Sequence, residues 1–275
     1  MVVQQHRRRG GAAAVAAAVA GVMAASGCSG GGAAAEDRSG GGSAGEVRRA
    51  ADTLAGAGSS RARTSMEMAA GGTRVTIRGE GGYDFARRMG QLKLVLPQDP
   101  AGDDEHEPIT ELLAPGALYM KNRGAGVPAD KWVRVDTTAL EDGNLVTGGA
   151  TDPLAAAELL RGAQDVTYIG EMKLAGRQVR HFRGTTDIGR AARVAEPHAR
   201  ASLAAAAKGF TKDVVPFDAY LDEEGRLRKV RHRFSFANQG RTVAVTSTTV
   251  LFDFGARVDV RLPDARDIYS GKVRA

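Results

Sequence analysis

The sequence contains few of the residues from which catalytic and metal sites are most often built. It has 275 residues but a single cysteine, five histidines and only 5% aromatic residues. One cysteine excludes an intramolecular disulfide framework and a zinc site built on several thiolates. No two histidines have the spacing of metal ligands, and no nucleophile elbow, P-loop or dinucleotide fingerprint follows a predicted strand. We therefore predict that the protein is not an enzyme and has no catalytic residues, metal or cofactor.

The first 27 residues have the composition of an export signal. Arg7, Arg8 and Arg9 form a basic start, and an uncharged stretch rich in alanine and valine follows over residues 12–25. This stretch is too short to span a bilayer comfortably as a permanent helix, which is typical of a cleaved signal peptide. It leads through small residues into the only cysteine, in the tetrad Ala25–Cys28.

This tetrad resembles the lipobox of bacterial lipoproteins, with Ala25 where leucine is most usual. The resemblance implies cleavage between Gly27 and Cys28, a diacylglycerol on the Cys28 thiol, and an anchor on the extracytoplasmic face of the cell membrane. The alternative is an ordinary secretory signal with a chance cysteine. Residues 28–45 are rich in glycine, serine and alanine and predict a flexible tether, which favours the lipobox because a tether is useful only if the cysteine is held.

A large part of the chain's excess of basic over acidic residues lies in this predicted signal. The formal charge is +6, and removal of residues 1–27 takes away three arginines and no acidic residue, which leaves +3. Nucleic-acid binding proteins instead carry a clustered basic face. We therefore predict no nucleic-acid partner.

Residues 46–275 predict a single α+β domain, a curved many-stranded antiparallel sheet with helices packed on its concave side. Alternating segments pair around short turns such as Gly71-Gly72. Helical spacing predicts helices over 46–54, 152–161 and 188–208, the last interrupted or kinked at Pro197. Near the end, Leu227 is out of phase with the apolar face of its strand, which predicts a bulge near Arg228.

Five segments extend the resemblance from the signal to the domain. The segments are KWVRVD at 131–136, DPLAAAELLRGAQDVTYIG at 152–170, RQVRHFRGTTDI at 177–188, PFDAYLDEEGRLRKV at 216–230 and TTVLFDFGARVDVRLP at 248–263. In this order they resemble the actinobacterial lipoproteins of the LppX/LprG type, relatives in fold of the carrier LolA. The resemblance implies a half-closed sheet plugged by helices, with acyl chains of lipids or glycolipids held between them.

The resemblance makes a lipid or other acylated amphiphile the expected ligand, and the protein a lipid carrier. Its alanine-rich helices and few aromatics would leave apolar volume unfilled, although a compositional bias explains the same alanines. The residues expected to line that space are Met66, Met68, Leu118, Trp132 and Leu160. The alternative is a surface-tethered interaction or sensor protein with the same fold, no bound lipid and an unknown protein partner.

Three polar features have competing interpretations. The acidic run from Asp99 to Glu107 lacks the order of a calcium-binding loop and lies among prolines, which favours a solvated hairpin loop. His181 and His232 lie in predicted strands, where half-buried structural residues are more usual than bases or ligands. Arg231 and Arg233 share one strand face and are candidates for contact with anionic lipid headgroups, against the alternative of ordinary solvent exposure.

Overall fold

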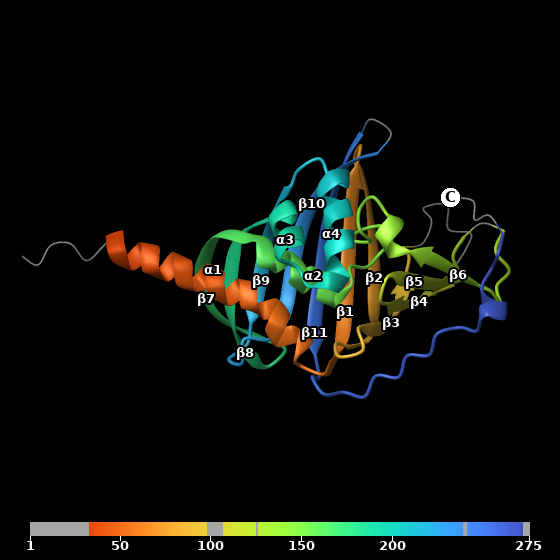
Figure 1. Cartoon of the computed structure of the whole chain (residues 1–275), viewed down its shortest axis with the longest axis horizontal. Coiled ribbons are helices and arrows are strands. Elements are labelled where there is room, and N and C mark those ends of the chain that lie inside the picture. The colour runs from red at the N-terminus through yellow and green to blue at the C-terminus, as the bar shows by residue number, and fades with distance from the viewer. Residues whose placement is uncertain (1–32, 98–106, 125, 239–240, 272–275) are drawn as a thin grey trace, which may run out of the picture.

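The computed structural model describes residues 33–97, 107–124, 126–238 and 241–271 (Figure 1). They contain one open sheet of eleven strands in the order β6-β5-β4-β3-β2-β1-β11-β10-β9-β8-β7, and every neighbouring pair is antiparallel. The strands are β1 Ser59–Ala70, β2 Thr73–Asp84, β3 Met89–Val95, β4 Ile109–Ala114, β5 Ala117–Lys121, β6 Trp132–Asp136, β7 Ala163–Leu174, β8 Arg177–Asp187, β9 Val214–Leu221, β10 Leu227–Asn238 and β11 Arg241–Phe252. The predicted α+β class is confirmed.

The helices lie across one face of this sheet, which we call the inner face (Figure 1). They are α1 Ala33–Ala55, α2 Pro153–Leu159, α3 Ile188–Val194 and α4 Pro197–Gly209, with short 3-10 helices at η1 Thr137–Ala139, η2 Leu160–Gly162 and η3 Ala265–Asp267. The carboxylate of Asp152 caps α2 by accepting the amides of Leu154 and Ala155, and Pro153 occupies the first helical turn. Among the described residues, no helix is both long enough and apolar enough to cross a membrane.

The helices agree with one sequence prediction and differ from another. The helical segment predicted over 188–208 is interrupted before Pro197 as predicted, because the chain becomes extended at Ala195 and Glu196 and Pro197 then begins α4. By contrast, α1 begins at Ala33, so much of the segment predicted to be a flexible tether is helical here. The segment continues the helical turns anchored by the buried Val47 and Leu54, although its glycines at 40–42 have low helix propensity.

The strand register agrees with the predicted turns and bulge. Gly71 and Gly72 both have positive φ values, 55° and 86°, and connect β1 to β2 as a two-residue hairpin turn. Between β10 and β9 the register shifts from Leu227 to Lys229, so Arg228 is the extra residue of a bulge. Beyond the last strand, the chain crosses towards β6, where the amide of Tyr269 donates to the carbonyl of Trp132 (Figure 1).

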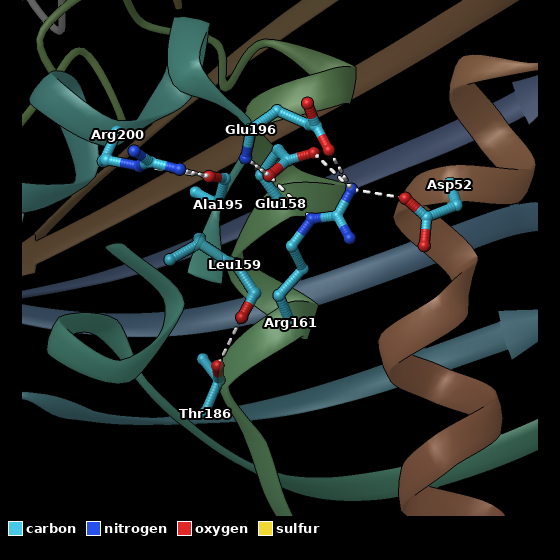
Figure 2. A network of polar contacts seen from close by, with 8 residues as sticks. All are labelled: Asp52, Glu158, Leu159, Arg161, Thr186, Ala195, Glu196 and Arg200. Carbon is cyan, nitrogen blue, oxygen red and sulfur yellow. Dashed lines mark hydrogen bonds and ion pairs between the residues drawn. The ribbon is translucent and has the colours of Figure 1, made fainter. Parts of the chain in front are cut away.

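An ion-pair network built on the buried carboxylate of Glu158 and the nearly buried Arg161 links the helices, with Asp52 and Glu196 at its exposed ends (Figure 2). Nη2 of Arg161 in η2 lies 2.6 Å from Oδ1 of Asp52 in α1, and its Nε lies 2.8 Å from Oε2 of Glu158 in α2. Oε2 of Glu158 also accepts the backbone amide of Glu196 at 3.1 Å, at the start of α4. Since Glu158 is almost fully buried, these charge-assisted bonds fix α1, α2 and α4 as one unit.

Candidate functional site

The inner face of the sheet brings together most of the residues predicted to line an apolar space. Met66 of β1, Leu118 of β5 and Leu160 of η2 are buried, and Met68 is half-buried. Leu118 and Leu160 belong to one buried apolar cluster, Met66 belongs to a second, and Met68 packs against both. The four side chains therefore lie on the helix-covered side, in two adjoining parts of the core.

Trp132 lies on the opposite, outer face. In the register of β5 and β6, Met120 pairs with Val133 while Lys121 pairs with Trp132, and Met120 shares the inner face with Leu118. The ammonium group of Lys121 lies 5.8 Å from the Trp132 ring centre, on the outer side. Trp132 consequently does not border the space between sheet and helices, which corrects its place among the predicted lining residues.

A pocket of about 80 Å³ opens between the inner face, α2 and α4. Its wall mixes apolar and polar side chains, including Tyr83, Asn144, Leu145, Asp152, Leu154 and His198. An engineered apolar cavity of about 150 Å³ binds benzene, and drug-sized ligands need about 300 Å³ or more. An acyl chain therefore fits between sheet and helices only if part of the cover moves.

The part of the cover with the least regular structure is the segment 142–151, which we call the covering loop. Its Asp142 carboxylate accepts the amides of Asn144, Val146 and Thr147, which folds the loop back on itself. Leu145 is fully buried and Val146 nearly so, in the same cluster as Met66. The loop therefore fills space beneath α4 with two apolar side chains and without helical or strand hydrogen bonding.

Few polar contacts join the covering loop to the sheet. Thr151 Oγ1 lies 2.6 Å from Ser247 Oγ of β11. The guanidinium of Arg123 donates to the carbonyls of Thr147 and Gly148 at 3.4 Å each, near the limit of a hydrogen bond. The loop is thus held to the sheet mainly by burial of its apolar side chains, whereas the helices also share the ion-pair network around Arg161.

Glu111 of β4 is the most unusual residue under this loop. Its side chain is fully buried, and neither carboxylate oxygen has a hydrogen-bond partner among the described residues. Burial raises the pKa of Glu111 to about 8, and the charge of Arg123 opposes that rise. Sequence reasoning missed this residue, although the alternation of β4 places Glu111 on the apolar face of Ile109 and Leu113.

His232 is a second titratable side chain on the inner face. It pairs in register with Ser247 and Phe217, its ring centre lies 5.7 Å from that of Phe234, and it is 1% exposed. Burial lowers the pKa of His232 to about 3, which makes it a neutral core residue at ordinary pH. The prediction of a half-buried structural histidine therefore understated its burial.

Arg233 lies on the outer face in a cluster around Asp218. The Asp218 carboxylate accepts bonds from His181 at 2.8 Å, Arg183 at 3.0 Å and Arg233 at 2.7 Å. Burial opposes ionisation of Asp218, but these three bonds hold its pKa at about 2. Arg231 lies beside this cluster on the same strand and is exposed, so the two arginines share the outer face as predicted but differ in exposure.

The other predicted sites lie outside the described residues in part or entirely. Cys28 and the cleavage position beside Gly27 precede Ala33, where the described chain begins. Most of the acidic run from Asp99 to Glu107 is likewise outside. Within the ranges that the structure describes, no group of three or more histidine, cysteine or acidic side chains is arranged to hold a metal ion.

The open antiparallel sheet and one-sided helices define this chain as an α+β protein of the half-barrel kind. No family model matches its sequence, and no curated protein matches it significantly. Solved structures similar to it include the lipoprotein LppX of Mycobacterium tuberculosis, with 9% identity over 80% of this chain and 98% of the other and a TM-score of 0.44. LprF of Mycobacterium bovis is 13% identical over 81% and 97%, with a TM-score of 0.41. A LolA superfamily protein of Nitrosomonas europaea is 10% identical over 82% and 97%, with a TM-score of 0.33. These are the groups that the sequence motifs resemble.

Proposed function

We propose that the mature protein is a membrane-anchored extracytoplasmic lipoprotein that binds an acylated amphiphile between its sheet and helices and carries it unchanged. The observation that carries this proposal is the covering loop, an irregular segment that fills the apolar space beneath α4 with Leu145 and Val146. An acyl chain is apolar like these two side chains, so it can take their place when they move out of the space. The lipobox-like tetrad before Cys28 supports the location.

The energetics of such an exchange are favourable for a long chain. Exposing Leu145 and Val146 costs roughly 3–6 kcal/mol, and each buried methylene of a ligand returns about 0.8 kcal/mol. About four to eight methylenes therefore offset the exposure of these two side chains. The remaining methylenes of a longer acyl chain must also offset exposure of Ala150 and Thr151. The helices remain in place in this account, because the Arg161 network joins them independently of the loop.

Loading is tested by native mass spectrometry of the purified protein after incubation with 1-monooleoylglycerol. We expect a one-to-one adduct, accompanied by faster amide hydrogen exchange in residues 142–151 and unchanged exchange in α1. An adduct without any change in the loop would contradict the proposed exchange, and a protein that takes up no amphiphile would contradict the function itself.

The anchor requires a separate test. Cells labelled with an alkyne fatty acid should incorporate the label into the wild-type chain, because two acyl chains on Cys28 hold a protein stably at a bilayer. The Cys28→Ala variant should remain unlabelled and be released from the membrane fraction. Labelling of that variant would contradict acylation at Cys28.

We propose that the exposed Arg231 and its neighbour Arg233 contact anionic headgroups while the anchored protein lies near the bilayer. A cation at an anionic surface contributes about 1 kcal/mol, roughly a fivefold change in vesicle affinity. Arg231→Glu should weaken sedimentation with phosphatidylglycerol vesicles at low salt, whereas Arg87→Glu in the β2–β3 turn serves as the control. If Arg231→Glu binds these vesicles as well as the control Arg87→Glu does, Arg231 does not contact the headgroups.

A second candidate function, a surface-tethered interaction protein without lipid, is favoured by one observation. Among the described residues no further strand pairs with the edge strand β7, which exposes Tyr168, Ile169 and Met172, each more than two-fifths accessible. An edge with apolar side chains is suited to strand addition by a partner. Tyr168→Lys and Ile169→Lys together should abolish such binding without affecting amphiphile uptake, so the two functions separate in one pair of assays.

A further inference from the structure

Glu111 occupies a position at which a carboxylate has no structural benefit. Its neighbours across the sheet on the inner face are Leu92 of β3 and Met120 of β5, both buried and apolar. A buried carboxyl without partners loses its hydration and gains no bond in return, so native interiors seldom contain one. A leucine here would pack against the same neighbours without that penalty.

The covering loop brings a second unpartnered acceptor to the same place. Asn144 Oδ1 is buried and has no partner among the described residues. A Cβ on Gly148 would lie 3.1 Å from this oxygen, 3.5 Å from Glu111 Oε1 and 3.2 Å from a methyl group of Leu118. Two acceptor groups from separate elements therefore lie near one point beside Gly148, over an apolar floor that includes Leu118.

The surrounding charge indicates which ligand chemistry suits this place. Arg123 is the charged side chain whose field reaches Glu111, and its guanidinium contacts the loop carbonyls directly above. A positive neighbour disfavours a cationic ligand group. A hydroxyl group both donates and accepts, so it pairs with a carboxyl group in either protonation state and with an amide oxygen.

We propose that Glu111 of β4 and Asn144 of the covering loop form the polar end of the ligand space and bind the hydroxyl groups of an amphiphile's head, which lies between them once Leu145 and Val146 have given way to the acyl chain and the loop has closed over the head. This inference rests on the proposed function and names the part of the ligand that the protein selects. The acyl chain then extends along the apolar inner face, from Leu118 beside the polar end towards the cluster that contains Met66 and Leu145.

The test compares two probes with the same acyl chain, 1-monooleoylglycerol with two hydroxyl groups and methyl oleate with none. Dissociation constants are measured for the purified full chain and its variants. Wild type should prefer monooleoylglycerol by about tenfold or more, as expected for hydrogen bonds to an ionisable group. Glu111→Leu should bind methyl oleate at least as well as wild type but lose the preference.

Two further variants distinguish this role from a general disturbance. Asn144 has a φ of 63°, so Asn144→Gly removes the amide without backbone strain and should lower the preference several-fold. Glu80→Leu replaces an exposed glutamate on the outer face and should leave the preference unchanged. If Glu111→Leu does not fold, Asn144→Gly alone decides.

The possible outcomes distinguish failure of this inference from failure of the proposed function. If wild type binds both probes equally, or if the variants keep the wild-type preference, Glu111 and Asn144 do not select hydroxyl groups and the inference is wrong, while lipid binding stands. If wild type binds neither probe, the proposed function itself fails.

Discussion

The buried carboxyl of Glu111 makes stability depend on pH in a direction opposite to that of most carboxylates. Its pKa rises from 4.5 in the unfolded chain to about 8 in the folded protein, chiefly through burial. Between these values the native state binds more protons than the unfolded state, so unfolding free energy falls as pH increases. The slope is about 1.4 kcal/mol per pH unit, and the whole effect amounts to roughly 5 kcal/mol at pH 8.

Glu111→Gln isolates this contribution, because glutamine has nearly the same shape and does not titrate. The free energy of unfolding is measured by urea denaturation at intervals from pH 5 to pH 8 for both proteins. The variant should be comparable to wild type near pH 4.5 and increasingly more stable as the pH rises above 5. His232 has its pKa lowered to about 3 by burial, so its own effect has the opposite sign and lies between about pH 3 and 6.5. It is present in both proteins and cancels in their difference. A difference that stays constant from pH 5 to pH 8 would refute the burial of an unpartnered carboxyl at this position.

Three other substitutions have definite expected outcomes. Asp218→Asn should cost roughly 2 kcal/mol at pH 7, because the wild-type carboxylate has a pKa of about 2 and its stabilisation is lost only as pH falls from 3.8 through 2; equal unfolding free energies at pH 7 would contradict the cluster. Gly143→Ala places a Cβ in collision with the Ser202 carbonyl oxygen at a φ of 59°, so thermal unfolding should occur several degrees lower and hydrogen exchange should rise in the covering loop; unchanged exchange would show that the loop does not depend on this contact. Leu160→Trp overfills a fully buried position and should cost about 1–3 kcal/mol while weakening amphiphile uptake; unchanged uptake with a large stability loss would remove Leu160 from the ligand space.

Local patterns in the sequence were sufficient for the strands and their turns. The two-residue turn at Gly71-Gly72 and the bulge at Arg228 follow from glycine conformation and from the phase of alternation, both of which are local. The interruption of the helical segment 188–208 at Pro197 is local in the same way, because proline cannot continue the preceding helix and begins α4 instead.

The position of side chains relative to the core required information that is not local. Alternation correctly separated Trp132 from Val133, but only pairing with Lys121 and Met120 shows which of them faces the helices. The covering loop is rich in glycine, aspartate and asparagine and therefore reads as a solvated connection. Its Leu145 is buried by elements distant in sequence, and no spacing within 142–151 could indicate that.

The site was only partly accessible from sequence for the same reason. Met66, Leu118 and Leu160 are predicted to line the space because they are bulky residues on opposing elements, and each is buried on the helix-covered side. The sequence does not mark Glu111 as a site residue, because a single glutamate in the short strand ITELLA is ordinary on an exposed face. Its significance depends on which face of β4 is covered, which the fold determines.

The central claim is that an acyl chain binds between the inner face and the helices, and photo-crosslinking tests it most directly. A monoacylglycerol with a diazirine on its acyl chain is bound to the purified protein, irradiated, and the adducts are mapped by peptide mass spectrometry. The account predicts adducts on peptides that contain Met66 or Leu118 and on the covering loop, all competed by unlabelled monooleoylglycerol. Adducts confined to the outer face near Trp132 or to the exposed edge at Tyr168 would contradict it.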